Sequence, residues 1–413
     1  MLTVLRNNTY AKLFSAQIIA LLGTGLLTVA LGLLAYDIAG KNAGVILGVA
    51  MTIKMVAYVA VAPLSAALTS RLSRKHVLIG TDLVRASIAL MLPFVSEAWH
   101  IYVLIFLLQS ASATFTPAFQ AVIPSILPDE EKYTQALSLS RLAYDLEALA
   151  SPLIAAALLT IISYNNLFLG TVLGFAVSAI LIFAAHLPHI DAPQQSPFLD
   201  RLTLGVREFW RRVELRGLMG LNLVVATATA MVIINTVVIA QGVLNQDESF
   251  VAIMLGVYGG GSMLVALTMP RVLARRSDHT VMLTGAVILL AALAGVGSAL
   301  AWNTTATQRI VLLVLWSVLG AATSLILTPL ARILRRQSSE QTRPAVFAAQ
   351  FSLSHSCFLV TYPLAGVLGA SLGLATTAWL LVGIGVVGLG IAGVSWRNLT
   401  TAQNHQSQQQ PRA

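Results

Sequence analysis

The sequence predicts an all-α polytopic membrane protein with twelve transmembrane helices in two six-helix pseudo-repeats. Hydrophobic residues make up 57% of the 413 residues and charged residues only 10%, whereas a soluble domain averages about 25% charged residues. The apolar residues gather in segments of about 20 residues, which is the length that crosses a bilayer. One long polar connection divides these segments six and six.

Segments of spanning length follow one another with short loops between them. We expect helices at 13–36, 44–68, 77–95, 101–124, 134–162, 166–185, 218–240, 251–270, 280–301, 309–331, 346–369 and 375–395. The predicted organisation is an N-terminal six-helix bundle (1–185), a cytoplasmic linker with an amphipathic helix (186–217), a C-terminal six-helix bundle (218–397) and a disordered cytoplasmic tail (398–413). Within the linker, apolar residues at helical spacing among charges predict a helix that lies on the inner leaflet.

The basic residues indicate how the chain is oriented. Most of the 25 Lys and Arg residues fall in every second loop, and such loops face the cytoplasm. Both termini are therefore expected to be cytoplasmic, with the chain multi-pass in the cell inner membrane. Because topology accounts for the net charge of +9, no nucleic acid partner is required. The single cysteine excludes an intramolecular disulfide and a cysteine-based metal cluster. We expect no cleavable signal peptide.

Prolines at matching places indicate that the two halves repeat. Three pairs recur at a nearly constant spacing, and they are Pro63 with Pro270, Pro117 with Pro329, and Pro152 with Pro363. Two parallel six-helix repeats place a substrate site at the midplane between them.

The segment 134–162 carries charges that a bilayer disfavours. An ionised side chain at bilayer depth costs at least about 2.5–3.5 kcal/mol, so such residues mark functional pathways. Arg141 and Asp145 are four residues apart, and a simple local ion pair is an equally good interpretation of these two. Glu147 lies deeper and is the better functional candidate.

Lys54 lies in the middle of the second predicted helix. Our hypothesis is that Lys54 and Glu147 face a shared polar cavity and exchange partners during transport, with Glu147 or Asp145 binding the coupling proton. The alternative is a static buried pair. Charge-neutral variants of Lys54 and Glu147 that transport normally would contradict the hypothesis.

Further polar residues within the predicted helices are candidates for lining a cavity, namely Tyr144, Gln109, Asn222, Asn235 and His355. Imidazole binds a proton or a borderline metal such as nickel, so His355 is a weak metal candidate, although a hydrogen-bonded packing histidine explains it better. No other metal site and no cofactor is expected. No nucleotide-binding motif is present, which argues against ATP as the energy source.

The loop after the second predicted helix resembles a signature of the major facilitator superfamily, Gly-x-Leu-x-Asp-Arg-x-Gly-Arg-Lys. Arg71, Arg74 and Lys75 match its basic positions, and Ser70 stands in place of its Asp. A nearby i,i+3 pair, Asp82 with Arg85, is expected to compensate for that missing carboxylate. A solvated basic loop that follows the positive-inside rule is the alternative interpretation.

The fifth predicted helix resembles the antiporter signature Gly-Pro-x-x-Gly-Gly of the same superfamily. Ser151, Pro152, Ala155 and Ala156 occupy its positions, and small residues there permit close helix approach. In the fourth helix the family's Arg is replaced by Phe106, while its Gln is retained as Gln109. The runs around residues 115–130 and 138–147 resemble the macrolide-efflux and drug:proton antiporter branch, near siderophore exporters and nickel-resistance exporters.

These features together predict a secondary transporter that works by alternating access. The resemblance implies proton-coupled efflux of a small molecule, metal ion or chelate, with protons, the lipid bilayer and the substrate as its partners, by a monomer. An uptake permease of the same fold is the alternative. An intramembrane enzyme would need a nucleophile–base pair or a metal cluster that the sequence lacks, and a membrane scaffold would need a sizeable soluble domain.

Overall fold

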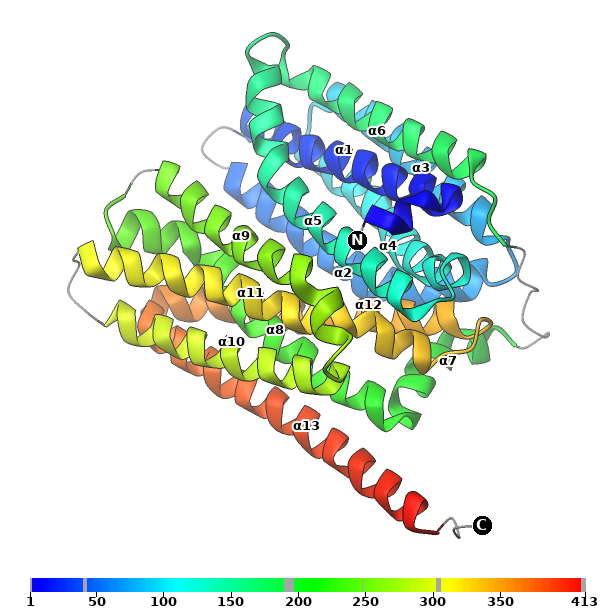
Figure 1. Cartoon of the computed structure of the whole chain (residues 1–413). Coiled ribbons are helices and arrows are strands. Elements are labelled where there is room, and N and C mark those ends of the chain that lie inside the picture. The colour runs from blue at the N-terminus through cyan, green and yellow to red at the C-terminus, as the bar shows by residue number, and fades with distance from the viewer. Residues whose placement is uncertain (1, 40–42, 189–196, 247, 302–305, 410–413) are drawn as a thin grey trace. The chain divides into compact units, whose positions relative to one another are not determined.

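The computed structural model describes residues 2–39, 43–188, 197–246, 248–301 and 306–409, and these residues are nearly all helical (Figure 1). Short helical turns η1 (Leu2–Arg6) and η3 (Leu92–Phe94) and a π-helix η4 (Val238–Val243) accompany the long helices. The long helices are α1 (Asn8–Ala39), α2 (Ala43–Thr69), α3 (Arg74–Met91), α4 (Ala98–Ile126), α5 (Glu130–Leu159), α6 (Tyr164–Ala184), α7 (Phe198–Arg211), α8 (Val213–Val237), α9 (Glu248–Leu273), α10 (Asp278–Leu300), α11 (Ala306–Arg336), α12 (Arg343–Leu372) and α13 (Leu374–Gln409).

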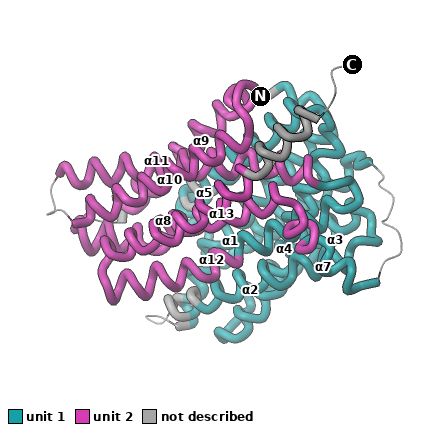
Figure 2. Tube along the Cα trace, turned by 90° about the horizontal axis from the view of Figure 1, so that it is seen from below, with its two compact units in different colours: residues 1–205, 338–355 teal, residues 206–337, 356–413 magenta. Residues whose placement is uncertain are grey.

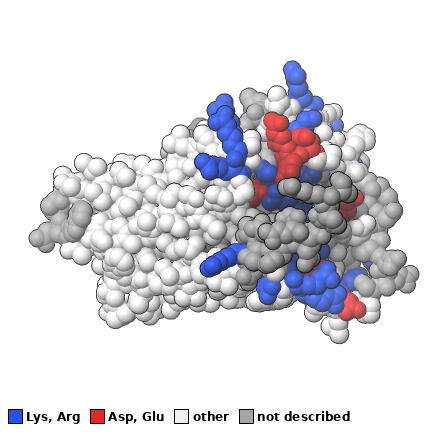
Figure 3. All heavy atoms as spheres, turned by 60° about the horizontal axis from the view of Figure 1, so that its bottom comes forward, with Lys and Arg blue, Asp and Glu red and all other residues white. Residues whose placement is uncertain are grey.

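The helix count agrees with the sequence prediction. Among the described residues, 11 helices are long and apolar enough to cross a membrane. The charge-bearing α5, with 30 residues, is the twelfth long helix, and the short α7 lies in the predicted linker. On the face that Figure 3 shows, charged side chains gather in one region, and the rest of the described surface there carries none. The last helix, α13, continues to Gln409 through a stretch for which the sequence predicts disorder.

Capping side chains define where several helices begin. Ser73 accepts a hydrogen bond from the His76 amide and starts α3, and Asp129 accepts one from the Lys132 amide and starts α5. Ser277 caps α10 in the same way. Each cap satisfies an amide that has no partner within its helix. A serine or aspartate directly before the first residue of these helices therefore fixes where each loop ends.

The chain forms two compact units (Figure 2), one of residues 1–205 with 338–355 and the other of residues 206–337 with 356–413. This division differs from the predicted boundary, because the first part of α12 belongs to the first unit. There the Arg343 guanidinium donates to the Ser125 hydroxyl over 3.4 Å, and the Ser352 hydroxyl donates to the Val59 carbonyl. Hydropathy locates a helix but does not reveal which bundle it packs against.

The helices of the two units pair in the same order, as a repeat predicts. In the first unit α1 packs most extensively on α6 and α2 on α4, and in the second unit α8 packs on α13 and α9 on α11. Small residues allow these close crossings. A Cβ atom on Gly174 of α6 would lie 3.1 Å from the Cα of Gly23, and one on Gly220 of α8 would lie 2.2 Å from the Gly388 carbonyl oxygen.

The linker helix α7 is amphipathic, and its less polar side packs on protein. Phe209 is 1% exposed, and a Cβ atom on Gly205 would lie 2.2 Å from the Ala345 carbonyl oxygen. Leu199 and Trp210 are exposed. The predicted helix is present and contacts α12 at Gly205, and its position on the inner leaflet stays a prediction.

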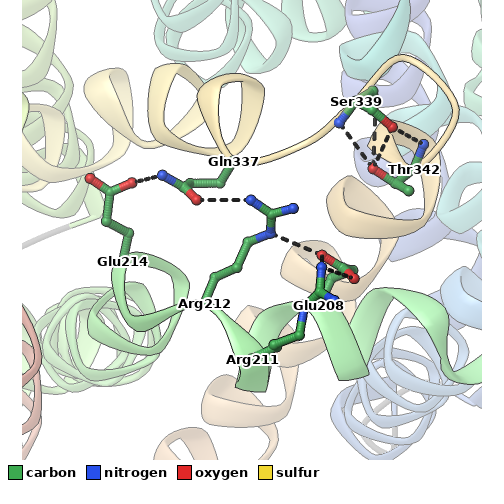
Figure 4. Close-up of polar contacts among 7 residues, drawn as sticks. All are labelled: Glu208, Arg211, Arg212, Glu214, Gln337, Ser339 and Thr342. Carbon is green, nitrogen blue, oxygen red and sulfur yellow. Dashed lines mark hydrogen bonds and ion pairs between the residues drawn. The ribbon is translucent and has the colours of Figure 1, made fainter.

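A polar network joins the end of α7 to the helices of the second unit (Figure 4). Glu208 accepts from Arg212 over 2.9 Å and from Arg211 over 3.1 Å. Arg212 also donates to the Gln337 side-chain oxygen over 3.2 Å, and Gln337 in turn donates to Glu214. The chain entering α8 is thereby attached to the end of α11.

This network predicts a dependence of stability on pH. Burial raises the pKa of Glu208, but the bonds from Arg212 and Arg211 outweigh it, so the pKa lies below its ordinary 4.5. Because the folded pKa is depressed, the stabilisation is complete above about pH 4.5 and is lost as the pH falls through the folded value. We expect the melting temperature to fall less between pH 6 and 4 in Glu208→Gln than in the wild type. Equal falls in both proteins would contradict this.

Candidate functional site

The charged residues of α5 divide into a local pair and a separate carboxylate. Arg141 and Asp145 form the ion pair that their spacing predicts, at 3.0 Å, and the Asp145 side chain is only 8% exposed. Glu147 lies instead against α1. A Cβ atom on Gly25 would lie 2.9 Å from Glu147 Oε1 and 2.0 Å from the Ser151 hydroxyl oxygen. The absence of a side chain at Gly25 thus makes the space that Glu147 occupies.

Lys54 of α2 lies within electrostatic range of Glu147. Both side chains are half-buried. The Lys54 ammonium also lies 5.5 Å from the centre of the Tyr58 ring, one helical turn further along α2, in a cation–π arrangement. The two charges that the sequence hypothesis pairs are thus within electrostatic range of each other, and the exchange of partners stays a prediction. The sequence analysis did not name the aromatic ring beside Lys54.

Tyr144 links α5 to α1. Its side chain hydrogen-bonds to Gln17, and the Gln17 side-chain oxygen also accepts a bond from Ser140 over 3.1 Å. Tyr144 remains 36% exposed, whereas Gln17 is 6% exposed. Gln17 is a second polar residue that sequence reasoning missed, because one amide in a long apolar helix gives no periodic signal.

Asp82 and Arg85 form a buried ion pair deep in the first unit, 0% and 5% exposed. The Ser178 hydroxyl of α6 donates to the second Asp82 oxygen over 2.7 Å. The guanidinium lies between two rings, 4.1 Å from the centre of Phe115 and 4.5 Å from that of Phe175. The sequence predicts this pair as a substitute for a loop carboxylate, but the structure places it in the packed interior of α3, α4 and α6.

His355 of α12 packs against α2. Its Nδ1 lies 2.7 Å from the Phe351 carbonyl oxygen, and because a carbonyl only accepts, Nδ1 carries the proton. The imidazole meets the Tyr58 ring edge-on at 4.8 Å. The described residues contain no group of three or more His, Cys, Asp or Glu side chains that could hold a metal ion. These contacts are those of a packed histidine.

The basic loop residues anchor helix ends. Arg74 donates to the carbonyl oxygens of Ala121 and Glu340, over 3.3 and 2.7 Å, and Lys75 donates to that of Ala185 over 2.9 Å. The Lys75 cation at Ala185, the C-cap of α6, stabilises that helix end. Arg71 is exposed. Ser70, which replaces the family's Asp, accepts a bond from Arg201 of α7 over 2.9 Å.

The remaining predicted residues are dispersed. Ala155 is buried in the core of the first unit, Ala156 is exposed, and Gln109 is half-buried on α4. Pro152 lies in α5, and its side chain is outside the described part. In the second unit, Asn222 is buried, and the Asn235 amide donates to the Ala365 carbonyl of α12 over 3.4 Å. The structure thus gathers Lys54, Tyr144, Glu147, Arg85 and His355 in one unit, apart from the two asparagines.

The fold is shared with solved membrane transporters. The human organic anion transporter MFSD10 aligns with a TM-score of 0.78 at 12% identity, over 94% of this chain and 99% of that chain. A bacterial homologue of the iron transporter ferroportin in an outward-facing state gives 0.79 at 12% identity over 94% and 99%. The fucose:proton symporter of E. coli gives 0.73 at 15% identity over 94% and 98%.

At 12–15% identity, these similarities show that the chain shares the fold of these proteins. A model of the Major Facilitator Superfamily matches residues 13–296, and the chain belongs to this family. This confirms the family and the twelve-helix fold predicted from the sequence.

Among curated proteins, the macrolide efflux protein A of Streptococcus pyogenes is 24% identical over 192 residues, 45% of this chain and 47% of that protein. The protein of the same name from Enterococcus faecalis is 28% identical over 144 residues, covering 34% and 44%. The chain thus spans about half the length of these relatives. An uncharacterised MFS-type transporter of Bacillus subtilis, YfiS, is 24% identical over 344 residues, 79% of this chain and 80% of that protein.

Proposed function

We propose that this protein is a proton-coupled efflux transporter that exports a small molecule by alternating access. It would act in the cell inner membrane as a monomer, with both termini in the cytoplasm. The partial similarity to macrolide efflux proteins supports export and makes macrolides the first substrate class to test. Metal ions and chelates remain alternative cargo.

The observation that carries the proposal is the position of Glu147. This carboxylate is half-buried in a long helix, against Gly25 of α1 and within electrostatic range of Lys54. Charged groups at such depth are costly and are retained where they serve transport. Asp145 forms an ion pair with Arg141, which favours its ionised state. Of the two carboxylates on α5, Glu147 is therefore the better candidate to carry the proton.

The proton step follows from these positions. With Glu147 ionised, its charge balances that of Lys54. When Glu147 binds a proton, the positive charge of Lys54 is no longer balanced. The ionised and the protonated carboxyl therefore favour different arrangements of α2, which carries Lys54, and α5, which carries Glu147. A ligand shifts a conformational equilibrium only through such differential interactions, and here the proton is that ligand.

The test is growth inhibition of a strain that lacks the gene, with plasmid-borne wild type, Glu147→Gln or Glu131→Gln. The panel contains macrolides, dyes, nickel and cobalt, with siderophore secretion as a further readout. Wild type should restore resistance to one class, and Glu147→Gln should reduce it to the level of the empty vector. Glu131→Gln is the matched control, because Glu131 is exposed in the first turn of the same helix.

Two outcomes would contradict the proposal. Full resistance with Glu147→Gln would remove Glu147 from the coupling step. Greater sensitivity when wild type is expressed, together with better growth on a scarce nutrient, would indicate an uptake permease of the same fold.

A further inference from the structure

The ring of Tyr58 is shared between a cation and a second helix. Lys54 lies over it at 5.5 Å. The rings of Phe351 and His355, both on α12, lie 4.8 Å from its centre. All four side chains belong to the first unit, and after His355 the helix α12 continues as part of the second unit. Tyr58 therefore contacts both Lys54 and the part of α12 that belongs to the first unit.

Further contacts hold this part of α12 in register with α2. The Ser352 hydroxyl donates to the Val59 carbonyl, next in sequence to Tyr58. The bond from His355 Nδ1 to the Phe351 carbonyl fixes the orientation of the imidazole, and the Phe351 and His355 rings also contact each other in a tilted arrangement, with their centres 4.3 Å apart. A change in the position of the Tyr58 ring must therefore move both aromatic side chains or lose contact with them.

Several charges surround this ring. Lys54 is in electrostatic range of Glu147 on α5 and of His355 on α12. Arg85 on α3 and Tyr144 on α5 are in range of Tyr58. Arg85 is paired with Asp82, so among these groups the Lys54 and Glu147 charges are the ones whose balance changes when Glu147 is protonated.

We propose that Tyr58 is a positioning residue that couples the protonation of Glu147 to α12. The inference rests on the proposed role of Glu147 in transport. Ionised Glu147 and the Tyr58 face compete for Lys54. When Glu147 is neutral, Lys54 is drawn further onto the ring, since the negative face of the aromatic ring attracts a desolvated cation. The ring then shifts, and its contacts with Phe351 and His355 change.

The protein contains its own reporter for this movement. Cys357 is the only cysteine, it is half-buried, and it lies two residues after His355 on α12. Its rate of reaction with N-ethylmaleimide in native membranes, divided by the rate in denatured protein at the same pH, measures how accessible α12 is directly after His355, where the helix continues into the second unit. Glu147→Gln mimics the protonated carboxyl at constant pH. We expect it to change the normalised rate about fivefold or more, a usual size for coupling between sites.

Glu147→Gln is then combined with substitutions at other positions, and its effect on the labelling rate is measured in each variant. In Tyr58→Leu and in Lys54→Gln, Glu147→Gln should leave the rate unchanged. In Tyr58→Phe the coupling should persist, because the phenyl ring keeps the π face. Tyr102→Leu, a partly buried tyrosine of the α4 core outside this cluster, should also retain it. A merely structural role of Tyr58 would shift the basal rate without removing the effect of Glu147→Gln.

Persistence of the Glu147→Gln effect in Tyr58→Leu, or its loss in Tyr58→Phe, would overturn the proposal. If Tyr58→Leu does not fold, as shown by labelling at the denatured rate, the proposal is still tested in Lys54→Gln, because persistence of the Glu147→Gln effect without the cation would overturn it. The labelling requires no substrate. If Glu147→Gln keeps full resistance while the coupling is observed, the proposed role of Glu147 in transport fails and the positioning role of Tyr58 stands.

Discussion

Asp82→Asn is expected to destabilise the protein by about 3–5 kcal/mol, the usual cost of removing one partner of a buried ion pair. Asn retains the shape of the side chain and its contact with Ser178 but leaves the Arg85 guanidinium without its anion. Asp82 is 0% and Arg85 5% exposed, so water cannot compensate. The rings of Phe115 and Phe175 offset only part of the loss. Thermal unfolding in detergent, and the yield of folded protein, measure the effect.

The controls separate a buried charge from a general change. Asp37→Asn alters an exposed carboxylate that accepts a bond from Tyr164 over 2.7 Å, and its cost should be about 1 kcal/mol or less. Adding Arg85→Met to Asp82→Asn removes the unpaired cation and should recover most of the stability. If Asp82→Asn melts at the wild-type temperature, the pair does not stabilise the bundle in the way its burial indicates.

Gly25→Ala is expected to abolish transport and to lower stability by about 1–3 kcal/mol, as overpacking of a helix interface does. The new methyl group would lie 2.0 Å from the Ser151 hydroxyl oxygen, 2.2 Å from its Cβ atom and 2.9 Å from Glu147 Oε1. α1 and α5 must then separate, and the carboxylate must leave its place. Resistance in the growth assay and the melting temperature are the two measurements.

The same helix provides the control. Gly32→Ala adds an identical group where nothing lies within 4 Å, so both transport and stability should be kept. Combining Ser151→Gly with Gly25→Ala frees the space and should restore part of the transport. The glycine in α5 should itself lower the free energy of unfolding by about 1 kcal/mol, because glycine has a low helix propensity. Loss of transport in Gly32→Ala would show that any methyl group on this helix is harmful, and the assigned clash would then be wrong.

Local spacing predicted some pairs in the site correctly. Arg141 and Asp145 are four residues apart on one helix, and they form the expected ion pair. The i,i+3 pair of Asp82 and Arg85 is also present. The depth of the second pair was not predictable, because α6 supplies Ser178 and Phe175 from about 90 residues further along the chain, and no periodicity within α3 reports on that contact.

Other parts of the site depend on contacts that the sequence does not encode locally. Tyr58 stands one turn after Lys54 on α2, and this i,i+4 spacing could have identified it as the partner of the cation. Its second set of contacts, with Phe351 and His355, required α12 to pack on α2. Gly25 resembled any other glycine of an apolar helix until the structure placed Glu147 and Ser151 against it.

The sequence by itself determined the class of fold, the number of long helices, the repeat and the family. These follow from apolar length, charge placement and short motifs, which act over one helix or loop at a time. Only the tertiary structure decided that α12 begins in the first unit, that Arg85 lies between two aromatic rings, and that Tyr58 contacts Phe351 and His355 of α12. The physical reason is that these features are set by packing between helices far apart in sequence, where close fit, and not hydropathy, selects the neighbours.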